Sequence, residues 1–406
     1  MTETAPPLPH PSGDPWKSRL PILTLAHVIG TLHITSLVVM APVIKDDLAL
    51  SFAQFGFLVT AYSVGQVTGS LPAGNLADRV GVGWALVIAH GLLTCGALLL
   101  TQTTGLWLGM AAMLMTGWGY SIMNPSTAKG VFEFFGPERR ATAMGIKQTG
   151  VPIGGVIAAS LGAFAEAGSW HWVTASIAGV TAVSTLIYAP LLERPPSRSA
   201  HAPSRSRFGN LGEVMRDFNF GRFVAVNTLY NIGQQNFFAY LTLFMREAVQ
   251  VSQEAAGLCY GAAQASSVVG RLGWGAVTDF LLKRRRKFLT IAIGVAAALF
   301  LAALGTIDAR AGLTAAIALS LLLGLTIASY APLMQTIAVE NVPARLAGSA
   351  TGYTLVGTYV GSICGPPLFG WIVDVTGLFE SGWYLCAALV AVGVALLMFG
   401  FRERTA

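Results

Sequence analysis

The sequence predicts an all-α membrane protein with twelve transmembrane helices, arranged as two six-helix pseudo-repeats, with both termini in the cytoplasm. Three observations support this prediction. Of the 406 residues, 54% are hydrophobic and 11% are charged, whereas soluble domains carry about 25% charged residues. Apolar runs of the ~20 residues that span a bilayer recur along the chain. Arginine and lysine concentrate in alternate connections, which is an orientation signal.

The predicted spans cover nearly the whole chain. They are residues 20–44, 53–76, 84–102, 105–130, 141–165, 170–191, 220–244, 256–278, 288–307, 311–337, 346–373 and 381–401. With the N-terminus inside, the cytoplasmic segments hold most of the 25 Lys and Arg residues, whereas the periplasmic loops hold only Lys45, Arg246 and Arg310. The asymmetry predicts a multi-pass protein of a bacterial inner membrane.

The only long connection between predicted spans divides the chain into two halves. It is rich in Pro, Ser and Arg, a composition typical of a linker. The predicted domains are a disordered cytoplasmic tail (1–19), a six-helix bundle (20–191), the cytoplasmic linker (192–219), a second six-helix bundle (220–401) and a short tail (402–406). The halves repeat, since Asp78 follows the second span and Asp279 follows the eighth. Parallel repeats indicate a transporter with its site at the midplane between them.

Lys129, Lys147 and Arg271 lie within predicted spans, the last two of them deep inside, and no carboxylate lies in the middle of a span. Lys147 lies ~10 Å from the nearest span end and Arg271 lies ~12 Å from its own, at ~1.5 Å per residue. An ammonium inside a bilayer is costly and therefore indicates a functional site. The alternative for Lys147 is a side chain that extends its charged end back to the headgroups.

Residues 74–81, Gly-Asn-Leu-Ala-Asp-Arg-Val-Gly, resemble the loop signature of the major facilitator superfamily between its second and third helices. Residues 275–279, followed by a basic run, resemble the copy of this loop between helices eight and nine. With the spans and the linker, the resemblance covers about residues 20–401. It implies the fold of that superfamily and rocking-type alternating access. In one departure, Met113 stands where the family often has a helix-four arginine tied to proton coupling.

The signature loop predicts a conformational latch. An aspartate at a helix end can cap the N-terminus of a neighbouring helix and pair with arginine. We therefore expect gating roles for Asp78, Arg79 and Asp279, away from the substrate. Simple capping of a helix end is the alternative for Asp279.

The resemblance implies that helices five and eight face each other, so that Lys147 and Arg271 share one cavity. Two cations without acidic partners call for an anion, and the planar fork of arginine suits a carboxylate. Arg271, Gly275 and Asp279 also resemble the helix-eight pattern of monocarboxylate and related organic-anion carriers, in which this arginine binds the substrate carboxylate. The helix-one signature of those carriers is absent.

Further polar residues are predicted to line the cavity. Asn227, Tyr230, Asn231 and Gln234 lie on one helix face at i, i+3, i+4 and i+7, where they either line water or bond a neighbouring helix. The other predicted substrate-binding residues are Gln148, Tyr120, Asn124 and Tyr353. His27 and His33 are candidate proton carriers, because imidazole titrates near neutral pH, or they simply bond neighbouring helices.

The predicted function is secondary transport of a small organic anion, with a carboxylate as the expected class, coupled to protons or to exchange. The alternatives are a multidrug or toxic-compound exporter, although exporters of cationic drugs usually need a membrane-embedded carboxylate, and a non-transporting sensor with the same fold. No Walker motif or catalytic constellation stands out, so we expect no enzyme activity, cofactor or metal site. We expect a monomer in the lipid bilayer whose partners are the anionic substrate and, as a candidate, protons, but not nucleic acid.

Overall fold

The computed structural model describes residues 14–136, 138–162, 164–165, 170–192, 209–282, 285–310 and 312–403. This part of the chain is helical and contains no β-strand. The predicted N-terminal tail, except its last residues, and most of the predicted linker lie outside the described residues. Both predicted bundles therefore fall almost entirely within the structure.

The N-terminal bundle occupies the predicted range of the first six spans. Its elements are α1 (Pro15–Ser18), α2 (Leu20–Val39), α3 (Ala41–Asp47), α4 (Phe52–Thr101), α5 (Leu106–Phe134), α6 (Arg140–Gln148), α7 (Gly150–Gly162), α8 (Trp170–Ser184) and η1 (Thr185–Leu191).

The C-terminal bundle follows the linker. Its elements are α9 (Gly209–Arg216), α10 (Phe218–Glu247), α11 (Gln253–Ala276), η2 (Val277–Leu281), α12 (Arg286–Leu304), α13 (Gly312–Leu325), α14 (Ala331–Glu340), η3 (Ala344–Leu346), α15 (Ala347–Thr376), α16 (Phe379–Ala395) and η4 (Leu396–Gly400).

Within the described residues, six helices are long and apolar enough to cross a membrane, or seven if α3 and the start of α4 count as one bent span. The count of twelve spans and the cytoplasmic termini stay predictions. Several predicted spans are divided into shorter helices. The fifth is divided at Thr149 near Pro152, and the tenth at 326–330 near Pro332. Proline lacks an N–H and clashes with the preceding turn, which explains both breaks.

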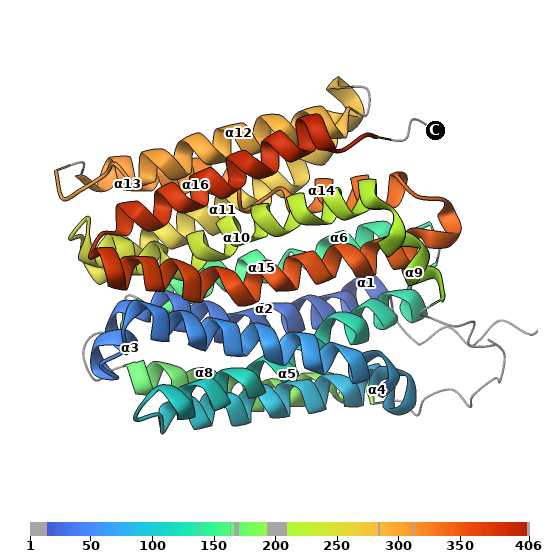
Figure 1. The fold of residues 1–406 in the computed structure, drawn as a ribbon. Helices are drawn as coiled ribbons and strands as arrows, with labels where there is room; N and C mark the ends of the chain where they lie inside the picture. Colours follow the sequence, from blue (N-terminus) through green and yellow to red (C-terminus); the bar gives the residue numbers. More distant parts are fainter. Residues whose placement is uncertain are drawn as a thin grey trace, which may run out of the picture.

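The second and third predicted spans form one helical element, α4, with a sharp kink at Gly81. Gly81 has φ 83° and ψ 167°, a conformation that glycine adopts at no steric cost. It is the last residue of the signature loop. The chain turns back at this point, so that both parts of α4 lie in the N-terminal bundle (Figure 1).

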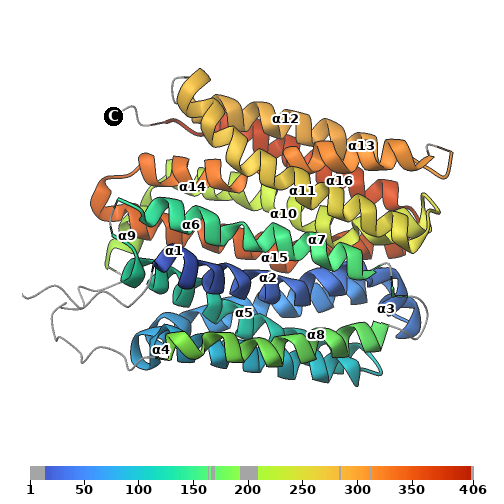
Figure 2. The same cartoon turned by 180° about the vertical axis from the view of Figure 1, so that it is seen from behind.

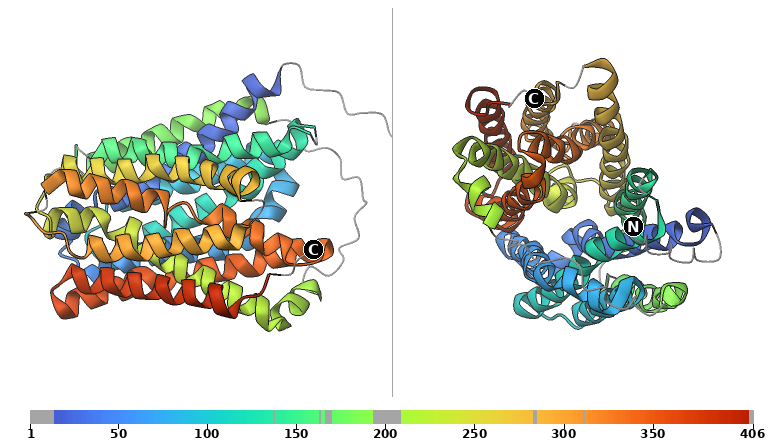
Figure 3. Two further views of the ribbon diagram at one scale, coloured as in Figure 1. Left: turned by 90° about the horizontal axis from the view of Figure 1, so that it is seen from above. Right: turned by 90° about the vertical axis from the view of Figure 1, so that its right-hand side faces the viewer.

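The two bundles lie side by side. The N-terminal helices, blue to green, form one layer, and the C-terminal helices, from the yellow-green α9 and α10 to red, form the other (Figures 1 and 2). An end view shows α6 and α7 on the side of the N-terminal bundle that meets the C-terminal bundle (Figure 3). Helix α1 and the C-terminal end of η4 lie at one end of the molecule, and α3 lies at the opposite end (Figure 1).

The bundles are fastened together at the end that carries α3. The carboxylate of Asp374, at the end of α15, accepts hydrogen bonds of 2.9 Å from the backbone N–H groups of Phe52 and Ala53. These groups belong to the first turn of α4, where backbone N–H groups have no partner within the helix. Gln253 and Thr242 donate to the carbonyls of Val39 and Val38 at the end of α2, at 2.8 and 2.6 Å.

An ion pair adds to this closure, because the ammonium of Lys45 lies 3.2 Å from the carboxylate of Glu247. Further inward, Thr60 donates to the carbonyl of Ile363 at 2.7 Å. Tyr240 also donates to the carbonyl of Phe52 at 2.8 Å, and all of these contacts between the bundles lie on the same side of the molecule. The structure is therefore closed at the α3 end.

Replacing Asp374 by alanine should weaken this closure. Loss of a helix N-cap costs ~1 kcal/mol, which corresponds to about a fivefold change in the ratio of closed to open molecules. Pulsed electron spin resonance between one label on each bundle at this end measures the ratio. Asp308→Ala is the matched control, because the hydrogen bond that Asp308 makes among the described residues lies within its own turn, from the N–H of Arg310. An unchanged distance distribution in Asp374→Ala would contradict the assignment.

Candidate functional site

A cavity of about 810 Å³, including the part open to solvent, lies between the two bundles. Helices α2, α4, α5 and α7 line it on one side, and α10 and α11 on the other. Most of its lining side chains are polar: Thr31, Thr35, Tyr62, Gln66 and Tyr120 from the N-terminal bundle, and Gln234, Gln235, Tyr260, Gln264 and Arg271 from the C-terminal bundle. It is therefore a hydrogen-bonding cavity at the junction of the two bundles.

Arg271 is the only charged residue among the described residues that line this cavity. One Nη2–H donates to the carbonyl of Ala328 at 3.3 Å. The Nε atom is buried and has no hydrogen-bond partner among the described residues. A buried N–H without a partner is costly, so this guanidinium has spare capacity to bind an acceptor.

The position of Arg271 along its helix is fixed by the packing of α11 against α13 and the turn that follows α13. An added Cβ at Gly270 would lie 3.0 Å from the carbonyl oxygen of Leu325 in α13 and 2.6 Å from Oγ of Ser329 just beyond it, so this close contact requires glycine. One turn along, the indole N–H of Trp274 donates to the carbonyl of Leu325 at 2.7 Å. Arg271 lies between these two contacts in sequence, and its backbone is held rigidly beside the cavity.

The structure separates Lys147 from Arg271. Lys147 is 1% exposed and does not line the central cavity in the described structure. Its ammonium donates to Oγ1 of Thr127 at 2.8 Å and lies 3.4 Å from Nε2 of His27. Nε2 of His27 is in turn 2.9 Å from the same hydroxyl. Lys147, Thr127 and His27, which we call the buried triad, join α6, α5 and α2 inside the N-terminal bundle.

The other histidines connect helices of the N-terminal bundle. Nε2 of His33 lies 3.0 Å from Oγ1 of Thr181, which links α2 to α8. His90, which sequence analysis did not single out, has its Nε2 2.7 Å from the hydroxyl of Tyr188. Neither histidine lines the central cavity among the described residues.

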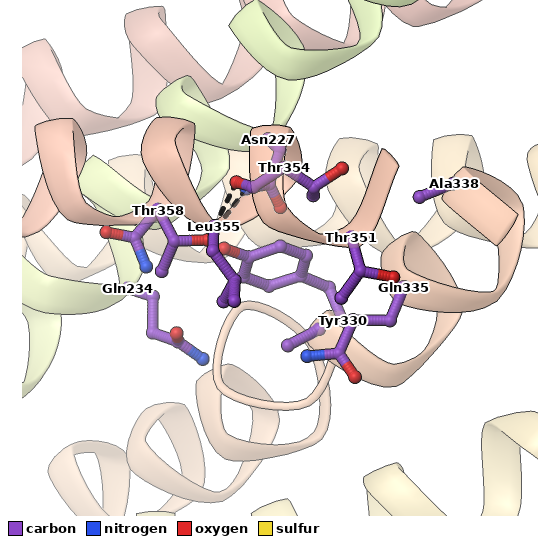
Figure 4. Close-up of a pocket in the computed structure, with 11 residues that line it drawn as sticks. Asn227, Gln234, Tyr330, Gln335, Ala338, Thr351, Thr354, Leu355 and Thr358 are labelled. Atoms are coloured by element: carbon purple, nitrogen blue, oxygen red, sulfur yellow. Dashed lines mark hydrogen bonds between the residues drawn. The ribbon is translucent and has the colours of Figure 1, made fainter. Parts of the chain in front are cut away.

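The polar stripe on α10 mainly lines a second pocket of about 460 Å³ within the C-terminal bundle (Figure 4). Asn227, Asn231 and Gln234 line it together with residues of α14 and α15. Asn227 also donates to the carbonyl of Thr354 and to Oγ1 of Thr358, at 3.1 and 2.9 Å. Asn227 therefore does both things that were expected as alternatives: it lines a pocket and it bonds a neighbouring helix. Gln234 lines both the second pocket and the central cavity.

The remaining predicted binding residues lie in different surroundings. Tyr230 is fully buried and donates to the carbonyl of Thr290 at 3.2 Å. Tyr353 stacks on Phe220, with ring centroids 6.1 Å apart. Asn124 and Gln148 are exposed. Within the described structure none of these four predicted residues lines the central cavity, whereas Tyr120 does.

The predicted gating residues pair within their own bundles. Asp78 lies 3.1 Å from the ammonium of Lys129 on α5. Asp279 lies 3.1 Å from Arg286, which also pairs with Glu340. Arg79 is exposed. No ion pair described at this end joins the bundles, as expected where the molecule is not closed.

At the same end, α9 is attached to the start of α15. Arg345 donates to both carboxylate oxygens of Glu213 at 2.7 Å. This hydrogen bonding holds the pKa of Glu213 below its usual value. The N-terminus of α15 itself, after Leu346, has no side-chain cap, so a helix end suited to a carboxylate is available there.

The family model of the major facilitator superfamily matches residues 23–356 and 223–406. The chain belongs to this superfamily. A hexuronate transporter of Bacillus subtilis (strain 168) is 28% identical over 410 residues, which cover 95% of each chain. Monocarboxylate transporter 13 of Bos taurus is 27% identical over 326 residues, which cover 77% of this chain and 72% of that protein.

A solved structure confirms the fold. A bacterial homolog of the human lysosomal transporter Spinster, in an inward-facing and occupied conformation, superposes with a TM-score of 0.79. The similarity covers 97% of this chain and 98% of that one, at 16% sequence identity. The predicted superfamily and its helical fold are therefore confirmed.

Asp78→Asn should slow turnover and leave substrate affinity roughly intact. Asp78 pairs with Lys129 at the end of the bundle and does not line the central cavity in the described structure, so its loss affects conformational exchange rather than binding. Initial transport rates and equilibrium binding, measured on the same preparation, separate the two effects. Glu254→Gln, at an exposed position on α11, is the control. A large loss of affinity with a normal rate of exchange would exclude the gating role.

Proposed function

We propose that this protein is a secondary transporter that moves a small organic acid anion across a membrane by alternating access. The single observation that carries the proposal is Arg271, whose guanidinium stands without a carboxylate in the cavity between the repeats. A guanidinium in a low-dielectric cavity favours an anion, and its fork matches a carboxylate. The names of relatives such as the hexuronate and monocarboxylate transporters support this class of substrate.

The charge distribution supports an orientation for this transporter. We propose that it has twelve spans, that both termini are cytoplasmic, and that it works as a monomer in a bacterial inner membrane. The α3 end, with Lys45 in its predicted periplasmic loop, then faces the periplasm. In this orientation the closed end is periplasmic and the structure is an inward-facing state.

A drug exporter fits the site less well, because no carboxylate lines the central cavity among the described residues. A non-transporting sensor with the same fold would bind its ligand at the same cavity. Uptake by proteoliposomes that contain the purified protein distinguishes a transporter from a sensor.

We assign proton coupling to the buried triad. Lys147 and His27 share one hydroxyl and lie 3.4 Å apart. Two cations at this distance repel each other strongly, so the pair favours a single added proton rather than two. The triad joins α2, α5 and α6, so a change in its charge would alter the packing of these three helices against one another. Lys147 was expected from the sequence to bind the substrate directly; we propose instead that it takes part in proton coupling.

Arg271→Lys should impair uptake nearly as much as Arg271→Ala. Lysine keeps the charge but loses the bidentate geometry, and truncation of one partner of a buried charged pair costs ~2–5 kcal/mol. Uptake and binding assays with the organic acid that a thermal-shift screen selects measure the effect. Arg310→Lys, at an exposed position, is the control. Near-normal uptake by Arg271→Lys would remove the carboxylate-binding role.

Lys147→Met should retain exchange of labelled for unlabelled substrate and lose accumulation driven by a pH gradient. Methionine fills a similar volume without a proton to exchange, and an uncharged side chain is easier to bury. Counterflow and gradient-driven uptake in the same proteoliposomes measure the two activities. The exposed Lys17→Met serves as the control. If Lys147→Met accumulates substrate as the unmodified protein does, the coupling role is wrong.

A further inference from the structure

Each bundle contributes one tyrosine–glutamine pair to the central cavity. Tyr62 and Gln66 lie one turn apart on α4, and Tyr260 and Gln264 lie one turn apart on α11. In each pair the glutamine amide donates to the tyrosine hydroxyl, at 3.1 Å and 3.2 Å. The same arrangement therefore occurs on both walls of one cavity.

The hydrogen bond within each pair determines what remains for a ligand. The phenol oxygen accepts from the amide nitrogen, so the phenol proton of Tyr62 is left to donate, whereas the phenol of Tyr260 also meets the Thr35 hydroxyl of the other bundle. The amide oxygen is left to accept, and no hydrogen bond within the described structure engages the amide oxygen of Gln66 or Gln264. A donor and an acceptor side by side match an alcohol hydroxyl, which both accepts and donates.

The rest of the lining extends this neutral polar character. Gln234 and Gln235 line the cavity from α10, and Thr31 and Thr35 line it from α2. Arg271 is the only charge among the described lining residues. A simple aliphatic acid would satisfy the guanidinium and leave these amides and hydroxyls without partners, which is costly once the site closes to water during alternating access.

We propose that the cavity binds a polyhydroxylated monocarboxylate, with its carboxylate at Arg271 and its hydroxyl groups at the two tyrosine–glutamine pairs. This inference rests on the proposed transport of organic acids and specifies the class of acid. Because the pairs belong to different bundles, a chain of hydroxyl groups bound to both connects the two halves that move in alternating access.

Gly155 on α7 makes room for the Gln264 side chain and so positions the pair of Tyr260 and Gln264. An added Cβ at this residue would lie 2.7 Å from Cδ of Gln264 and 2.9 Å from its Nε2. The glycine therefore lets α7 approach α11 with the Gln264 side chain between them. An alanine at position 155 would displace the amide from Tyr260 without touching the ligand itself.

Titration calorimetry with the purified full-length protein tests the proposal with four probes. Gluconate and hexanoate share a six-carbon chain and one carboxylate and differ in hydroxyl groups, glucuronate is a second hydroxylated acid, and glucose lacks the carboxylate. We expect at least one hydroxylated acid to bind about tenfold or more tightly than hexanoate, since a site built for hydroxyl groups rejects analogues without them. We expect glucose to bind more weakly than that acid by a similar factor or more.

Substitutions then test the pairs. Gln66→Leu and Gln264→Leu should each weaken binding of the preferred hydroxylated acid about fivefold or more and leave hexanoate binding unchanged. Gln102→Leu, at an exposed position, is the matched control. Gly155→Ala should reproduce the effect of Gln264→Leu, whereas Gly145→Ala, where a Cβ meets open space, should have no effect. If a leucine variant does not fold, Tyr62→Phe, which removes a single hydroxyl group, is used in its place.

The outcomes separate this inference from the proposed function. If hexanoate binds as tightly as both hydroxylated acids, or if the pair variants leave their binding unchanged, the polyhydroxylated class is wrong and organic-acid transport stands. If no acid binds, or if glucose binds equally well and Arg271→Ala does not alter binding of the acids, the proposed function is wrong as well.

Discussion

Contacts between side chains of one bundle and backbone groups of the other hold the two bundles together at the α3 end. The carboxylate of Asp374 accepts hydrogen bonds from the first backbone N–H groups of α4. Gln253 and Thr242 donate hydrogen bonds to the last backbone carbonyls of α2. Helix ends expose such groups wherever a helix stops. Apolar packing accompanies these hydrogen bonds, since the rings of Phe52 and Phe379 lie 5.0 Å apart and those of Phe55 and Tyr240 lie 6.2 Å apart, within a hydrophobic core that includes residues of both bundles. The rest of the arrangement follows, since a cavity enclosed on this side can exchange its ligand only through the other.

The second organising feature is the separation of the two deep cations. Arg271 faces the cavity with an Nε that has no partner in the described part of the chain, whereas Lys147 is enclosed by α2, α5 and α6 beside His27. In the proposed function, a substrate anion neutralises Arg271 and Lys147 exchanges a proton, so that binding and coupling would use different groups.

Patterns that depend on local sequence predicted the fold well. The apolar runs, the loop at 74–81 and the repeat of Asp78 by Asp279 indicated the superfamily, which the family match confirms. Residue spacing was less informative about the site. The stripe from Asn227 to Gln234 shares one helix face, yet its members bond a neighbouring helix, line a second pocket or reach the cavity. The tyrosine–glutamine pairs were missed, although their recurrence at one-turn spacing in the second and eighth predicted spans was a usable signal.

The sequence by itself determined that the chain is helical and apolar, and it predicted two related halves with Lys147 and Arg271 as the deep charges, because composition and periodicity are properties of the chain alone. Only the tertiary structure decided which cation faces the cavity. A helix presents different faces to different neighbours, and the direction of a side chain depends on which helices pack around it. The break at Thr149 between α6 and α7 determines which helices surround Lys147. The close approach of Gly155 to Gln264 determines which residues form the cavity wall.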